Sequence, residues 1–206
     1  MKYFLGLLFL ISLFSCDLEK KEQPLDKLEI EDDIKSSEDN FRAFENELEF
    51  AQFCVQQIIA GNYNSLNDYM DEKGILFSPY AYIDVETAQQ FDKERFNQSN
   101  EKMFWGYADG SGDSIVSTLD EFIKKHVSWL NLKDPKLKIN VYKDKPKTYG
   151  SELHNVQEIF PNNTYVEFYL PPSQEGYFDW NALIVVVDKE NSNYLLKAIL
   201  HNQWTI

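Results

Sequence analysis

The sequence predicts an α+β fold, in which helices come first and the strands of one antiparallel sheet follow. Apolar residues recur at helical spacing in residues 41–61. They alternate at strand spacing in residues 136–142 and 164–170, and a turn at 188–193 joins two further apolar segments as a hairpin. Helices followed by consecutive antiparallel strands are typical of α+β proteins and not of a doubly wound sheet.

The first half of the chain should be mainly helical. The expected elements are a helix at 41–61, a short helix at 62–70, an extended segment at 74–84, a helix from Thr87 to 96 and a helix at 118–130. Gly61 suits the C-terminal end of the first helix, because glycine accepts the left-handed conformation found there. Thr118 and Glu121 have the spacing of a capping box.

The second half should supply the sheet. Strands are expected at 136–142, 164–170, 182–188 and 193–206, and the apolar run at 182–188 indicates a strand buried on both faces. Strict alternation along the last strand would place the following residues on one face: Leu195, Lys197, Ile199, His201, Gln203 and Thr205.

Composition excludes some functions. The 206 residues suit one domain with extensions, and the formal net charge is −14. Binding to nucleic acid or to an anionic bilayer surface normally requires a basic patch, and the sequence shows none. We therefore expect neither as a partner.

The N-terminus indicates export. Lys2 is followed by mostly apolar residues from 3 to 14, a run too short to span a bilayer but suited to a secretory signal peptide. Leu13-Phe14-Ser15-Cys16 resembles a bacterial lipobox. The resemblance implies a lipoprotein: a signal peptide at 1–15, cleavage before Cys16, and lipid attachment at Cys16 with fatty acyl chains such as palmitate. Two or more chains anchor a protein stably to a membrane.

A tether should connect this anchor to the folded domain. Residues 16–40 are strongly acidic, contain Pro24 and lack aromatic residues, which indicates an extended, disordered segment. The domain itself should span 41–206. Acidic residues soon after the lipidated cysteine resemble the surface-export signal of Bacteroidota lipoproteins. This resemblance implies a cell-envelope location, at the outer membrane, on its periplasmic or surface face.

The order of elements resembles the NTF2-like (SnoaL-like) cone, in which N-terminal helices pack on a curved antiparallel sheet. The stretches "FSPYAYID", "WGYADGSGD", "VEFYLP" and "DWNALIVVV" also resemble an uncharacterised bacterial envelope domain. Ser114 replaces the proline usual in that family, and Asn202-Gln203 replaces an Asp-Glu pair. The resemblance implies a fold and a location, not an activity.

The stretch "DGSGD" allows two interpretations. Asp109, Ser111 and Asp113 offer oxygen ligands at alternate positions, as a Ca²⁺ site would require. However, Ser114 and Asp120 occupy the positions where a calcium loop needs Gly and Glu. We favour a tight turn whose glycines adopt positive φ, and we expect no metal or other cofactor.

The remaining candidates concern a pocket. The three histidines lack zinc-site spacing, and His126 lies near the end of a predicted helix, where a positive ring suits the helix dipole. His201 could act as a general base oriented by Asp113 or Asp179. Cys54 should be a buried, unreactive side chain. The candidate pocket residues are Tyr80, Trp105, Asp113, Asp179, Trp180, His201 and Trp204.

Two functions remain in competition. The first is a non-catalytic, lipid-anchored module that binds a ligand or partner protein through an aromatic-lined cavity. The second is a small hydrolase or isomerase that uses His201 with an acidic residue. We expect the first, because no catalytic motif stands out in the sequence.

Overall fold

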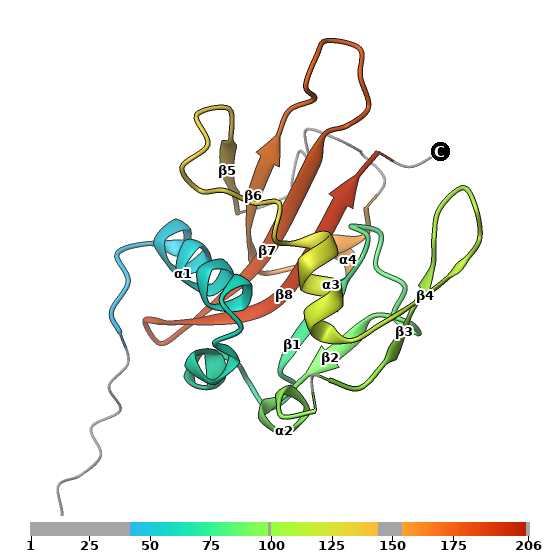
Figure 1. Cartoon of the computed structure of the whole chain (residues 1–206). Coiled ribbons are helices and arrows are strands. Elements are labelled where there is room, and N and C mark those ends of the chain that lie inside the picture. The colour runs from blue at the N-terminus through green and yellow to red at the C-terminus, as the bar shows by residue number, and fades with distance from the viewer. Residues whose placement is uncertain (1–41, 99, 144–153, 205–206) are drawn as a thin grey trace, which may run out of the picture. The chain divides into compact units, whose positions relative to one another are not determined.

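The computed structural model describes residues 42–98, 100–143 and 154–204. Residues 41–206 form one compact unit of mixed α+β structure with a curved, mostly antiparallel sheet (Figure 1). The expected α+β class is confirmed. The predicted signal peptide, Cys16 and the acidic tether lie outside the described residues. In the described part, no helix is both long and apolar enough to cross a membrane.

Six strands form the main sheet, in the order β2-β1-β8-β7-β6-β5. Their bounds are β1 Ile75–Ser78, β2 Gln89–Phe91, β5 Lys138–Tyr142, β6 Thr164–Leu170, β7 Asn181–Glu190 and β8 Asn193–Gln203. Neighbours are antiparallel except β1 and β8, which run parallel with Ser78 opposite Leu200. The carboxyl ends of β1 and β8 therefore point to the same edge of the sheet.

A second, two-stranded sheet contains β3 Met103–Tyr107 and β4 Ser114–Ser117. The helices are α1 Glu47–Ile59, the 3₁₀ helix η1 Tyr63–Tyr69, α2 Lys93–Phe96, α3 Leu119–His126 and α4 Val156–Ile159. In Figure 1, α1 and α3 lie over one face of the main sheet, and α4 lies on the other side.

Helix boundaries follow the capping side chains. Asn46 caps α1 by accepting the Glu49 N–H at 3.0 Å, so this helix begins later than residue 41. Gly61 follows its end at φ +71°, as predicted. The capping box of Thr118 and Glu121 at the start of α3 is also confirmed.

The predicted helix from Thr87 is wrong. Gln89–Phe91 instead forms β2, which pairs with β1, and only the four residues Lys93–Phe96 are helical. Asp92 stops the strand and starts this helix, because its side chain accepts the Arg95 N–H at 2.8 Å. Edge pairing with β1 therefore overrides the local helical preference.

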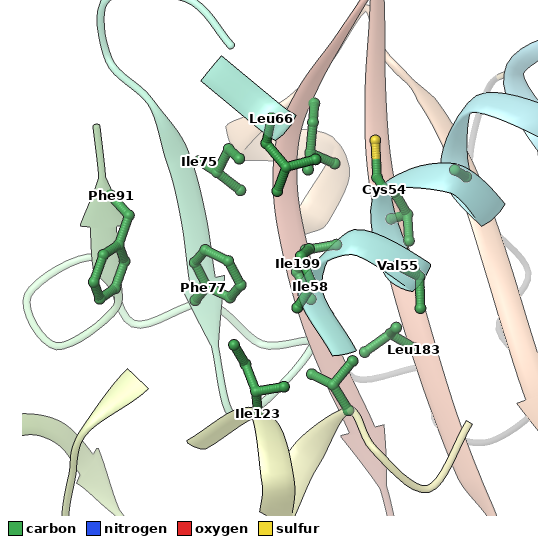
Figure 2. Packing of buried hydrophobic residues seen from close by; sticks show 14 of the residues in the cluster. Cys54, Val55, Ile58, Leu66, Ile75, Phe77, Phe91, Ile123, Leu183 and Ile199 are labelled. Carbon is green, nitrogen blue, oxygen red and sulfur yellow. The ribbon is translucent and has the colours of Figure 1, made fainter. Parts of the chain in front are cut away.

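The main core lies between α1, α3 and one face of the sheet. Figure 2 shows Val55 and Ile58 of α1 beside Leu183 and Ile199 of the sheet, and Cys54 of the same helix belongs to this buried cluster. Cys54 is fully buried and unpaired, and burial raises the pKa of its thiol. The predicted inert role of this cysteine agrees with its environment.

The opposite face of the sheet is also covered. Ile184 and Val186 of β7 join a second buried cluster with Ala81 and Ile83, which belong to the segment after β1. Asn155 fixes this segment, since its Oδ1 accepts the Ile83 N–H at 2.7 Å and its Nδ2 donates to the Ile83 carbonyl at 2.9 Å. The central strand is thus buried on both faces, as its apolar run predicts.

The β7–β8 hairpin is tighter than the sequence suggests. Asn191 (φ +47°) and Ser192 (φ +78°) form a two-residue turn with the positive dihedrals that favoured hairpins require. A register shift next to Val186 leaves Lys197 as an extra residue on β8. The expectation that Leu195 shares a face with Ile199 is therefore wrong; Leu196 does so instead.

Candidate functional site

A cavity of about 410 Å³ lies at the edge where β1 and β8 end. Three parts of the chain line it: the end of β1 with the segment that follows, strand β3 with its turn, and the end of β8. The lining residues are Ser78, Pro79, Tyr80, Ala81, Tyr82, Asp84, Thr87, Trp105, Gly106, Tyr107, Asp109, Asn202 and Gln203. The volume is in the range of small-molecule sites.

Tyr80 connects two walls of this cavity. The Ser78 hydroxyl donates to the Tyr80 carbonyl at 2.8 Å, which shapes the turn immediately after β1. The Tyr80 hydroxyl accepts the Asp109 N–H at 2.9 Å and so links this turn to the β3–β4 turn. The wall that follows β1 is thereby held against the hairpin.

Glycine at position 106 keeps the β3 wall close to Thr87. Gly106 has φ +103°, and a Cβ at this position would lie 3.1 Å from Thr87 Oγ1. A side chain would be strained by the backbone dihedral and crowded by the threonine. The two walls can approach each other here because this residue has no side chain.

Aromatic side chains dominate the apolar part of the lining. Tyr82 and Tyr107 are each 62% exposed, whereas Trp105 is almost fully buried. The indole N–H of Trp105 donates to the Ser117 carbonyl at 3.0 Å, and its ring stacks on Phe122. Trp105 is therefore a fixed wall, while the two tyrosines stand open to solvent.

The polar groups of the cavity carry negative charge. Asp84 and Asp109 are exposed, and no lysine, arginine or histidine occurs among the described residues that line the cavity. One Asp84 oxygen already accepts the Glu86 N–H at 3.0 Å. The electrostatic environment therefore disfavours an anionic ligand.

Asn202 is the unusual polar group of this lining. The residue is only 5% exposed, and its Nδ2, which is itself buried, has no hydrogen-bond partner within the described part of the chain. A buried donor without a partner costs about 1–3 kcal/mol. Asn67 Oδ1 and Asn140 Nδ2, which do not line the cavity, are likewise buried without a partner in the described residues, so this feature is not particular to the cavity.

The two buried histidines form a separate polar cluster. His126 Nδ1 lies 3.1 Å from His201 Nδ1, and His201 Nε2 lies 3.2 Å from Asn181 Oδ1. Because the Asn181 oxygen only accepts, His201 Nε2 carries the proton and His201 Nδ1 accepts from His126 Nδ1. His126 Nε2 then holds a lone pair, and in the described residues this atom has no partner.

Burial keeps both rings neutral. Burial lowers the pKa of His126 to about 3, helped by the charges of His201 and Lys125. Burial also lowers the pKa of His201 to about 4; the Pro79 backbone opposes this shift and Lys125 adds to it. A positive His126 ring at the end of α3, as its position near the helix terminus suggests, is therefore wrong at neutral pH.

The structure separates most of the predicted pocket residues. Tyr80 and Trp105 line the cavity, but His201 is 2% exposed and contacts His126 and Asn181. Asp179 is exposed, and its side chain accepts the Ser173 N–H at 3.0 Å. Neither Asp113 nor Asp179 hydrogen-bonds His201 among the described contacts.

The other two tryptophans predicted for the pocket, Trp180 and Trp204, also lie outside the cavity lining. Trp180 packs against Tyr169, and Trp204 stacks on Phe178 with ring centroids 4.7 Å apart. Sequence reasoning missed Tyr82, Tyr107 and Asn202 as lining residues. The replacement of Asp-Glu by Asn202-Gln203 was the available signal, but it gained meaning only with the parallel pairing of β1 and β8.

The "DGSGD" stretch is the turn of the β3–β4 hairpin. Gly110 and Gly112 have φ +82° and +70°, and the Gly112 N–H donates to the Ala108 carbonyl at 2.8 Å. The Asp113 carbonyl accepts the Ala108 N–H at 2.7 Å. The predicted turn with positive-φ glycines is confirmed. Within the described ranges, no group of three or more His, Cys, Asp or Glu side chains could hold a metal ion.

Comparisons with known proteins reveal one distant structural similarity. No family model and no curated protein matches the chain. One solved structure, a variant of a protein designated Rd1NTF2_05, matches at 10% identity with a TM-score of 0.33. The match covers 76% of this chain and 100% of that chain, and it is too distant to define the fold family.

Proposed function

We propose that the protein is a lipid-anchored envelope protein whose folded unit binds a small ligand without transforming it. The cavity at the ends of β1 and β8 is the ligand site. The observation that supports this proposal most directly is the cavity of about 410 Å³ itself, which the exposed side chains of Tyr82 and Tyr107 border.

Catalysis by His201 receives less support from the geometry. A general base needs access to the substrate and, commonly, a group that orients it. The His201 ring is enclosed and its nitrogens contact His126 and Asn181, neither of which supplies a carboxylate. The hydrolase or isomerase alternative would require His201 to reach a cavity that it does not line.

The fold proposal is an NTF2-like arrangement. The order of helices before a curved antiparallel sheet, and the position of α1 and α3 over one sheet face, support it. The anchor proposal rests on the lipobox-like residues ending at Cys16. Incorporation of an alkyne analogue of palmitate during expression in a bacterial host tests the anchor, and Cys16→Ala should abolish the label.

The binding proposal is tested with the full chain in detergent micelles. Ligand-observed NMR against small molecules of neutral, cationic and anionic classes should find binders whose signal is lost in a Tyr82→Ala/Tyr107→Ala variant. Tyr177→Ala is the matched control, since Tyr177 is 53% exposed and does not line the cavity. If no compound binds, or if every binder is unaffected by the double variant, the cavity is not the ligand site.

A further inference from the structure

We infer that the protein docks a basic segment of a partner protein on the surface that surrounds the cavity. Four segments form this surface: residues 79–87 after β1, residues 104–117 of the β3–β4 hairpin, residues 171–180 between β6 and β7, and residues 202–204 at and after the end of β8. We call it the acidic aromatic surface. The inference goes beyond the proposed binding of a small ligand, because it does not require a small molecule inside the cavity.

Contacts join the four segments into one surface. The Tyr80 hydroxyl accepts the Asp109 N–H at 2.9 Å, which links the segment after β1 to the hairpin. The end of β8 lines the same cavity as these two segments. Phe178 stacks on Trp204 with ring centroids 4.7 Å apart, and this contact places the β6–β7 segment against the end of β8.

Exposed apolar side chains gather on this surface. Ten large apolar or aromatic side chains are exposed in the described part of the chain, and eight of them belong to the four segments. The eight are Tyr82, Val85, Phe104, Tyr107, Val116, Tyr177, Phe178 and Trp204. Singly scattered apolar residues need no explanation, but a gathering of them marks an interaction site, and aromatic residues are enriched in protein interfaces.

The charge of this surface has one sign. Its four segments contain six acidic residues and no lysine, arginine or histidine, although the whole chain has 20 lysines and arginines. All six acidic residues are exposed: Asp84, Glu86, Asp109, Asp113, Glu175 and Asp179. Lys102, just before β3, and Lys138, the first residue of β5, lie outside these segments. An interface with complementary charge therefore requires a basic partner.

The two properties together select the kind of partner. A second copy of the chain docked through the same surface would bring like charges together, and an anionic lipid surface would be repelled. Arginine and lysine side chains pair with carboxylates and also lie over aromatic faces. A basic segment therefore suits both the carboxylates and the exposed rings of this surface, whereas an uncharged segment would use only the rings.

The test titrates short peptides into the isotopically labelled full-length protein in nonionic micelles. In the basic probes, arginine or lysine alternates with threonine; in the control peptides of equal length, glutamine or glutamate replaces the basic residue. We expect at least one basic peptide to bind saturably, with a Kd of about 10–500 μM, and the control peptides not to bind. NMR should show shifted amide signals in the four segments and unchanged signals in α1.

Two matched pairs of charge substitutions separate local from overall charge. Asp84→Asn/Asp109→Asn should weaken binding of the basic peptide about threefold, as expected for exposed ion pairs. Asp68→Asn/Glu72→Gln removes the same charge from exposed positions outside the surface, and it should change the affinity by less than about 1.5-fold.

A second comparison measures the aromatic contribution. Tyr82→Ala/Phe178→Ala should weaken binding about tenfold, because aromatic anchors contribute most of the binding energy in many interfaces. Val141→Ala is the control, since Val141 is exposed but lies outside the surface. The far-UV spectrum and unfolding midpoint of each variant verify that it is folded.

The outcomes distinguish this inference from its competitors. It fails if neither basic peptide saturates the protein up to about 1 mM, or if both charge variants weaken binding equally, because overall charge alone would then attract the peptide. A dimer that Phe178→Ala dissociates would show that a second copy covers the surface. Broadening of the surface signals by a spin label in the micelles would show that lipid covers it. Either result overturns the inference, and binding of small molecules is measured separately.

Discussion

His201 and Asn202 are neighbours on β8, and their side chains enter opposite faces of the sheet. His201 faces α3 and is paired through both ring nitrogens, to His126 and to Asn181. Asn202 lines the cavity and leaves Nδ2 without a partner in the described residues. Two polar residues of nearly equal burial, 2% and 5% exposed, therefore have very different environments.

The difference shows why burial alone does not identify a functional polar residue. His201 attracts interest in the sequence because histidine is a versatile catalyst, but its partners keep it neutral and fixed. Asn202 attracts little interest as a residue type. The cavity that it lines is formed by segments distant in sequence, and the sequence does not reveal this cavity.

The largest expected effect is the acid sensitivity of the histidine pair. In the unfolded chain, histidine binds a proton below about pH 6.5, whereas the folded rings resist protonation down to pKa values of about 4 and 3. The contribution of the two histidines to the free energy of unfolding should be fully present above about pH 6.5. Below that pH, the free energy of unfolding should fall by about 1.4 kcal/mol per pH unit for each histidine. Urea unfolding between pH 7.5 and 4.5 measures this slope.

Carboxylates contribute a slope of the same sign, so a matched variant is needed. Burial raises the pKa of Asp71, but its hydrogen bond from Lys197 and the charge of that lysine outweigh burial and lower it. His126→Leu keeps these carboxylates and removes one titrating ring, and should reduce the histidine part of the slope by about half. An unchanged slope would show that the pair is not neutral in the folded state.

A second prediction compares a fully partnered amide with the unpartnered one. Asn155 makes two hydrogen bonds to the backbone of Ile83 and fixes the segment that leads from β1 along the cavity. Asn155→Leu should lower the free energy of unfolding by about 2–3 kcal/mol, because it leaves both Ile83 groups without this partner. Chemical denaturation at pH 7.5 measures the change; a loss below about 0.5 kcal/mol would contradict the role of this clamp.

Local patterns predicted much of the fold. The capping box at Thr118, the helix stop at Gly61 and the apolar run of β7 all depend on neighbouring residues, and each was recognisable. The strand at Gln89–Phe91 was not, since its conformation is set by pairing with β1. The register shift beside Lys197 was also hidden, because it depends on the opposite strand.

The site was less predictable than the fold because it also depends on pairing between strands that are distant in the sequence. Tyr80 and Trp105 stood out as aromatic residues in suggestive stretches, and both line the cavity. Asn202 lines it because β8 runs parallel to β1 and ends beside Tyr80, a pairing between distant segments. No periodicity in either segment encodes that pairing.

A third prediction separates the shape of the cavity from its polarity. Tyr80→Phe removes the hydroxyl that accepts the Asp109 N–H at 2.9 Å, but keeps the aromatic ring. We expect a loss of about 1 kcal/mol in stability, as is usual for one hydrogen bond, and weaker ligand binding because the two walls are no longer linked. Hydrogen exchange of the Asp109 amide should accelerate; exchange equal to that of the wild-type protein would mean that this link does not form.

The smallest expected effect is the change in the free energy of unfolding caused by Asn202→Leu, and its sign is informative. Asn202→Leu should leave the free protein as stable as the wild type or raise its free energy of unfolding by up to about 1 kcal/mol, since it removes an unpartnered buried donor. Asn155→Leu, the same substitution at a partnered amide, should have the opposite effect. If Asn202→Leu instead destabilises the protein as strongly as Asn155→Leu, the Asn202 side chain makes a stabilising hydrogen bond and its amide is not unpartnered.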